Sequence, residues 1–165
     1  MRSNSSQLFN LEIEKINKKG SKIIKKSEPK TGEDHFTYPA TNKKAKLYIV
    51  KYKKEIIYVG ITKQSITNRL RSGLNPNTKN GYYGYRWRFF KKVDLTVWCD
   101  SGHDRPSKDK LEKDVLDSET IEGEIAYLFR KDKGYWPKYQ TEIHFHKATP
   151  KQKIIAQQIY TIAKR

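Results

Sequence analysis

Two short runs of β-branched and aromatic residues constrain the fold of this 165-residue chain more than any other feature. They span residues 47–50 and 56–59, and a mostly charged segment of five residues, 51–55, joins them. Such residues favour extended strands, and a short polar connection favours antiparallel pairing of the two strands that it joins. The sequence therefore predicts a β-hairpin over residues 47–59.

Capping residues and hydrophobic periodicity predict the remaining elements. The expected elements are a helix from Ser65 to Gly73, a third strand over 93–97, a helix over 118–133, a strand over 142–146 and a last helix that Thr149-Pro150 begins. Together they predict an α/β (α+β) domain in which helices flank a small central antiparallel sheet of about three strands.

The first 45 residues differ in composition from the rest, since they are rich in lysine and interrupted by glycine and proline, which indicates a basic N-terminal extension. Leu8, Leu11, Ile13 and Ile16 fit the spacing of a short amphipathic helix in this extension. We therefore divide the chain into the extension (1–45), one domain (46–147) and a C-terminal helix (148–165) that packs on the domain or is appended to it.

The net charge indicates the kind of partner. The chain has 35 Lys and Arg against 18 Asp and Glu, a formal charge of +17, and a protein this basic is expected to bind a polyanion such as DNA. The sequence shows no membrane-spanning run, its first residues lack the apolar stretch of a signal peptide, and its single cysteine, Cys99, suits a reducing compartment. These features predict an intracellular, cytoplasmic protein.

One segment of this basic chain is acidic. Residues 104–124 contain eight acidic and four basic residues, a net charge of −4. A solvated helix face would account for most of these acids. Metal-dependent chemistry on phosphates also requires carboxylates, so this segment is where a metal ligand is expected.

Four residues whose side chains could act on a phosphate or bind a metal ion are distributed in order along the predicted elements. Tyr48 lies in the first strand of the hairpin, and the block Tyr58-Val59-Gly60 closes the second. Arg69 follows eleven residues after Tyr58, in the predicted helix, and Glu122 lies near the start of the later helical face. In this order they resemble the GIY-YIG nuclease superfamily, and the resemblance covers roughly residues 46–145.

The resemblance implies hydrolysis of phosphodiester bonds. Tyr48 and Tyr58 would lie beside the attacking water and the phosphate, and a phenol that acts as a base needs nearby cations, because its ordinary pKa is near 10. Arg69 would hold the phosphate oxygens with its planar guanidinium group. Glu122 would bind one divalent ion per site, Mg²⁺ or Mn²⁺, with waters and the phosphate as further ligands. Gly60 would let the DNA backbone approach the strand closely.

Some positions have two interpretations. Lys63 follows the Tyr-Val-Gly block closely and is a further catalytic candidate, or one surface lysine among many. Glu124 rivals Glu122, because both flank the apolar face of the same helix; the resemblance favours Glu122.

The chain also departs from the family pattern at three places. Lys46 stands where the first motif has a glycine. A histidine that some members carry one helical turn after the arginine would fall at Gly73. The family often has an asparagine late in the domain, and the nearest counterpart here is Gln140.

A binding surface is predicted around residues 82–92, where rings and cations alternate. Rings can stack on bases while cations pair with phosphates, although the larger rings of this segment could instead belong to the core. The candidate nucleic-acid-binding residues are Gly60, Lys63, Arg71, Arg86, Arg88 and Lys91.

The sequence thus predicts a metal-dependent endonuclease that cuts DNA, with RNA as a further substrate to consider and restriction of foreign DNA as its setting. A homodimer would allow both strands to be cut. The alternative is a non-catalytic, basic nucleic-acid-binding module on the same scaffold. A structural protein of a ribonucleoprotein particle would explain the charge but not the ordered tyrosines, arginine and glutamate.

Overall fold

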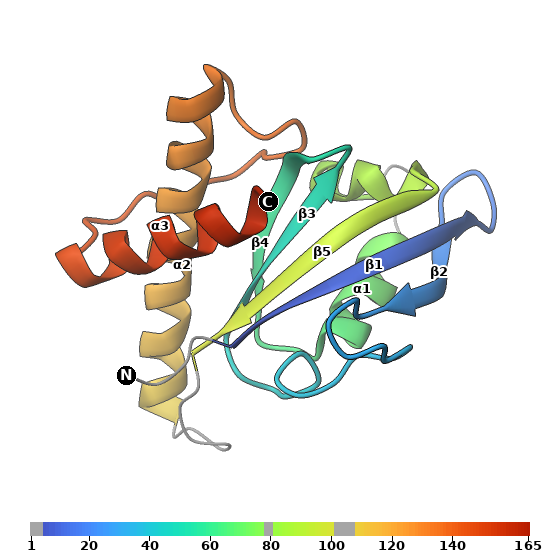
Figure 1. Cartoon of the computed structure of the whole chain (residues 1–165), viewed down its shortest axis with the longest axis horizontal. Helices are drawn as coiled ribbons and strands as arrows, with labels where there is room; N and C mark the ends of the chain where they lie inside the picture. The colour runs from blue at the N-terminus through green and yellow to red at the C-terminus, as the bar shows by residue number, and fades with distance from the viewer. Residues whose placement is uncertain (1–4, 78–80, 101–107) are drawn as a thin grey trace.

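A computed structural model describes residues 5–77, 81–100 and 108–165 and contains a five-stranded antiparallel sheet with helices on both faces (Figure 1). The strand order across the sheet is β2-β1-β5-β3-β4. The elements in chain order are β1 (Ser5–Lys15), β2 (Ser21–Ser27), β3 (Lys46–Tyr52), β4 (Glu55–Thr62), α1 (Ile66–Leu74), the 3₁₀ helix η1 (Tyr83–Phe89), β5 (Lys92–Cys99), α2 (Lys108–Lys133) and α3 (Pro150–Ala163). The predicted α+β class is confirmed, and the sheet has two strands more than predicted.

The inner strand β3, between β5 and β4, is buried along almost its whole length because helices cover both faces of the sheet. Successive side chains alternate between the faces. Leu47 and Ile49 belong to the apolar cluster that α2 and α3 complete, whereas Tyr48 and Val50 belong to the cluster that α1 and η1 complete. The tyrosine of the first motif therefore lies on the α1 side of the sheet.

The helix predicted in the first 45 residues is wrong, because this segment forms strands β1 and β2. Phe9, Leu11 and Ile13 are all buried and alternate with polar residues, which is the period of a strand. β1 pairs with β5 on one side, with Phe9 opposite Leu95, and with β2 on the other. The N-terminal segment thus supplies two strands of the sheet, and β2 forms one of its edges.

Two further expectations differ from the structure. The long helix α2 begins at Lys108 rather than at residue 118, and Lys110 and Asp114 form an ion pair of 2.9 Å in its first turns. The strand predicted over 142–146 is absent, and this segment has no regular structure. It packs against α2 instead of beside a strand, since a Cβ atom at Gly123 would lie 3.4 Å from the His144 carbonyl oxygen.

Two of the three predicted helix starts, at Ser65 and Thr149, are confirmed. The Ser65 hydroxyl accepts a hydrogen bond from the Asn68 N–H at the start of α1. Thr149 and Gln152 form a reciprocal capping box at the start of α3, with Pro150 in its first turn. Among the residues that the structure describes, none of the helices has both the length and the apolar character that crossing a bilayer demands.

Lys46 is the most unusual buried residue of the hairpin. Its side chain is fully buried, and its ammonium group donates hydrogen bonds of 2.7–2.9 Å to the carbonyl oxygens of Asn42, Lys44 and Gln64. The ammonium group ties the segment before β3 to the turn after β4. This structural role accounts for a lysine at the position where the family resemblance expects glycine.

Candidate active site

The two tyrosines that the sequence singles out lie side by side in the hairpin. Tyr48 on β3 is opposite Gly60 on β4, and the ring centroids of Tyr48 and Tyr58 are 5.8 Å apart. Both side chains are buried, with 0% and 4% exposure. The hairpin pairing therefore brings the two motifs together, as predicted.

Gly60 makes room for these rings. A Cβ atom at this position would lie 2.7 Å from both Tyr48 Oη and Tyr58 Cε1, closer than real side chains approach. Gly60 itself is buried. Its role in the structure is to admit the two phenol rings, which replaces the predicted close approach of the DNA backbone.

Arg69 on α1 reaches the tyrosine pair from the helix side. Its Nε–H donates a hydrogen bond of 3.2 Å to Tyr48 Oη, and its guanidinium carbon lies 5.4 Å from the centre of the Tyr85 ring. Arginine stays positively charged at all relevant pH values. Of the two predicted tyrosines, Tyr48 is thus the one with a cation against its hydroxyl oxygen.

Tyr85 on η1 is a member of this network that sequence reasoning missed. Its Oη lies 2.9 Å from Tyr48 Oη, and the side chain is 1% exposed. The Tyr85 ring fills the space that a side chain at Gly73 would occupy, one helical turn after Arg69. The signal in the sequence was Gly73 inside the predicted helix that carries Arg69. A glycine at such a position leaves room for a large ring from another part of the chain.

Tyr58 differs from Tyr48 in its electrostatic surroundings. Burial raises the pKa of the Tyr58 phenol far above its usual range, and the neighbouring phenols Tyr48 and Tyr85 raise it further. Tyr58 therefore keeps its proton at any working pH. It can donate a hydrogen bond to a phosphate oxygen, but it cannot serve as a base.

Glu122 on α2 lies at the same end of the sheet as Gln140. Burial raises the pKa of the Glu122 carboxyl to about 8, and the charge of Glu119 raises it further, whereas a hydrogen bond from Gln140 and the charge of Arg69 oppose the shift. The Gln140 side-chain oxygen accepts a 3.0 Å hydrogen bond from the Val59 N–H on β4. Gln140 therefore connects Glu122 to the second motif.

The hydrogen bond from Gln140 and the charge of Arg69 act on Glu122 and favour it over its rival Glu124. Glu119, one turn before Glu122, lies 3.3 Å from the His146 Nε2 atom. The two predicted catalytic groups, Arg69 and Glu122, are close enough to influence each other electrostatically. The structure thus brings together Tyr48, Tyr58, Arg69, Glu122 and Gln140.

Other predicted residues lie apart from this cluster. Lys63 is exposed and lines a shallow depression with Lys108 and Glu112. Arg71 lines a cavity between β2 and α1, and Lys91 is exposed directly before β5.

The two arginines of η1 differ from each other. Arg86 is exposed, and its guanidinium carbon lies 4.9 Å from the centre of the Tyr83 ring. Arg88 is only 3% exposed and donates hydrogen bonds to the carbonyl oxygens of Lys19 and Tyr85. The expectation that Arg88 faces nucleic acid is therefore wrong, because its donors hold η1 against the β1–β2 turn.

The donor set fits one Mg²⁺ ion held by a single carboxylate. In the described part of the chain, His, Cys, Asp and Glu side chains form no group of three or more that could hold a metal. Mg²⁺ does not need one, because it commonly keeps several waters and binds through one or two carboxylates together with substrate phosphates. Glu122, half-buried and under the electrostatic influence of Arg69, is the residue that would hold it.

We expect the stability of the metal-free protein to depend on pH through Glu122. The folded-state pKa is about 8, above the ordinary value of 4.5, so the contribution to stability is complete below pH 4.5 and is lost as the pH rises through about 8. Urea unfolding of the wild type should show a loss of the order of a few kcal/mol over this range relative to Glu122→Gln. Parallel curves for the two proteins would contradict the assigned surroundings of Glu122.

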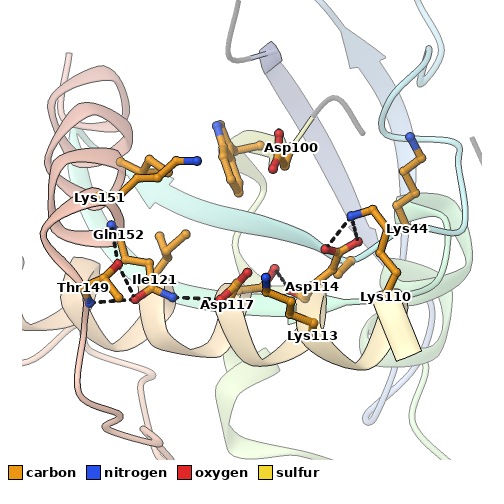
Figure 2. A pocket seen from close by; sticks show the side chains of 14 residues that line it. Lys44, Asp100, Lys110, Lys113, Asp114, Asp117, Ile121, Thr149, Lys151 and Gln152 are labelled. Atoms are coloured by element: carbon orange, nitrogen blue, oxygen red, sulfur yellow. Dashed lines mark hydrogen bonds and ion pairs between the residues drawn. The ribbon is translucent and has the colours of Figure 1, made fainter. Parts of the chain in front are cut away.

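Figure 2 shows a different cavity, of about 300 Å³, between α2, α3 and the end of β5. Its lysines and aspartates are partly paired with other lining residues. Lys110 donates to Asp114 at 2.9 Å, and the Gln152 amide donates to Asp117 at 2.9 Å. None of the residues of the tyrosine cluster (Tyr48, Tyr58, Tyr85 and Arg69) lines this cavity, so it is separate from the candidate active site.

Comparison with known proteins identifies no relative of this chain. No family model matches the chain, and no curated protein and no solved structure matches it either.

Proposed function

We propose that this protein is a metal-dependent endonuclease that hydrolyses DNA phosphodiester bonds with a GIY-YIG-like active site. The observation that carries the proposal is the hydrogen bond from Arg69 to Tyr48, close to Glu122. The three residues come from three different elements of the fold, α1, β3 and α2. Phosphodiester hydrolysis needs a cation for the phosphate, a polar group for the attacking water and a carboxylate for a metal ion. The cluster offers one residue of each kind.

Each residue has a distinct part in the proposed reaction. The Arg69 guanidinium binds the oxygens of the scissile phosphate, and the Tyr58 hydroxyl donates a hydrogen bond to one of them. The proposed base is Tyr48 in its phenolate form, beside the Arg69 Nε–H. Its Oη takes a proton from a water whose oxygen forms a bond to phosphorus, and the ester P–O bond breaks. The leaving oxygen keeps the bonding electron pair and is then protonated by solvent. Glu122 would hold a Mg²⁺ ion, and the ion would supply Lewis-acid stabilisation of negative charge.

The net charge of +17 supports a nucleic-acid substrate, which would be held by exposed cations such as Arg86. Tyr82 and Tyr83, beside Arg86, are 41% and 43% exposed and could stack on bases. Restriction of foreign DNA in the cytoplasm is the setting that we propose. One active site per chain suits a homodimer for cutting both strands.

The proposal is tested with supercoiled plasmid DNA. We expect the wild type to nick and linearise the plasmid with Mg²⁺ and to leave it intact with EDTA. Arg69→Gln should cut about a hundredfold more slowly, because the phosphate loses a bidentate cation. Arg130→Gln, an exposed arginine on α2 that changes the net charge equally, is the matched control and should cut like the wild type.

One observation favours the alternative, a non-catalytic nucleic-acid-binding module. Tyr48, Tyr58 and Tyr85 are at most 4% exposed, so a substrate must displace some of their surroundings to reach the hydroxyl groups. Tight, salt-sensitive binding to DNA and RNA without cleavage of either would support this alternative. Cutting that Arg69→Gln does not slow would contradict the proposed site.

A further inference from the structure

A cavity between β2 and α1 lies outside the candidate active site. Its volume is about 280 Å³, just below the size of typical small-molecule sites, which is roughly 300–1,000 Å³. β2 and the turn before it form one side, and the face of α1 that carries Arg71 forms the other. The size of the cavity therefore suits one planar ring system rather than a stretch of duplex.

The charged residues that line this cavity are all cations. They are Lys22, Lys26 and Arg71, and none of the described residues that line the cavity is acidic. Lys22 pairs with Glu14 at 3.1 Å, but both side chains are more than half exposed, and such surface pairs contribute little. The rim can therefore bind an anionic group without first breaking a strong internal ion pair.

The floor of the cavity is apolar. It includes Ile23, Phe36 and Leu74, of which Phe36 is 6% and Leu74 1% exposed. The Lys26 ammonium group lies 5.6 Å from the centre of the Phe36 ring, so a cation stands beside the aromatic surface. An apolar, partly aromatic floor below a cationic rim suits a ligand with a flat ring and an attached phosphate.

Ser21 is a second, independent observation. Its side chain lines the cavity and is 2% exposed, and its hydroxyl has no hydrogen-bond partner among the described residues. A buried hydroxyl without a partner is unfavourable, because its lost hydrogen bonds to water are not replaced. The polar edge of a bound base would give this hydroxyl a partner.

We propose that this cavity binds one unpaired nucleotide of the substrate strand. The base would rest on the floor of Ile23, Phe36 and Leu74, and the adjacent phosphates would contact Lys22, Lys26 and Arg71. The inference rests on the proposed function for the identity of the substrate. α1 carries both Arg69, which reaches Tyr48, and Arg71, which lines this cavity. A paired base cannot enter, so the site selects bulged, displaced or single-stranded DNA.

Equilibrium binding in EDTA tests the inference without requiring cleavage. The probes are two duplexes of the same sequence that contain 2-aminopurine, either as an unpaired bulge or paired with thymine. We expect the wild type to bind the bulged duplex roughly tenfold more tightly and to change the 2-aminopurine fluorescence. The double variant Lys26→Gln/Arg71→Gln should lose this preference.

The double variant Lys43→Gln/Lys153→Gln is the matched control. It removes two exposed charges that do not line the cavity, so it should weaken binding to both duplexes equally and keep the preference. Thermal unfolding by circular dichroism checks that all variants are folded.

The outcomes separate this inference from the proposed function. Equal affinity of the wild type for the two duplexes, or a preference that survives Lys26→Gln/Arg71→Gln, would overturn the nucleotide site even if plasmid is cut. A preference that this variant alone removes, in a protein that cuts no DNA, would support the site and exclude the nuclease. A wild type that binds neither duplex would overturn both.

Discussion

Glu122→Gln is expected to slow Mg²⁺-dependent cleavage of plasmid DNA by about a thousandfold, which corresponds to roughly 4 kcal/mol of transition-state stabilisation. Glutamine has the size of the protonated carboxyl, and the pKa of about 8 means that Glu122 holds a proton at neutral pH without metal. The substitution should therefore leave the fold and DNA binding in EDTA unchanged. Cleavage rates at several Mg²⁺ concentrations, together with binding in EDTA, measure the two effects.

Glu124→Gln is the matched control for this prediction. It makes the same chemical change two residues further along α2. It should cut like the wild type. Comparable loss in the two variants would indicate a general effect of charge on α2 rather than a metal ligand at Glu122.

The parts of the fold that could be predicted from the sequence depend on local signals. The β-branched runs of the hairpin and the caps Ser65 and Thr149 act within a few residues of themselves, and the structure contains those elements. β1 is different, because its partner β5 lies more than eighty residues away, as in the pair of Phe9 and Leu95. The apolar residues of β1 fit a helical spacing or a strand spacing equally, and only pairing with β5 decides between them.

The candidate site shows the same division between local and long-range information. The hairpin register places Tyr48 opposite Gly60, so the meeting of the two motifs follows from short-range pairing. Tyr85 enters the site only because η1 folds back over α1 and fills the space beside Gly73. The burial of Arg88 likewise depends on its contact with the Lys19 carbonyl in a distant turn. Neither contact can be read from spacing along the chain.

Tyr48→Phe should reduce cleavage about as severely as Glu122→Gln, by roughly a thousandfold, because it removes the oxygen that is proposed to accept the proton of the attacking water. That oxygen contacts both Arg69 and Tyr85. Tyr85→Phe keeps it and removes only one of its partners, so the loss there should be about tenfold, the worth of one hydrogen bond. The order of the two effects distinguishes the group that reacts from the group that positions it.

Tyr52→Phe is the matched control, because Tyr52 lies on the same strand and stacks on Phe90 with its ring rather than with its hydroxyl. Single-turnover cleavage with saturating protein isolates the chemical step from DNA binding for all three variants. If Tyr85→Phe were as damaging as Tyr48→Phe, the proton acceptor could not be assigned to Tyr48 alone, and the two phenols would have to act as one unit. If neither variant slowed cleavage while Glu122→Gln did, water activation would lie with groups outside the tyrosine cluster, and the resemblance of the two motifs to a nuclease site would be structural only.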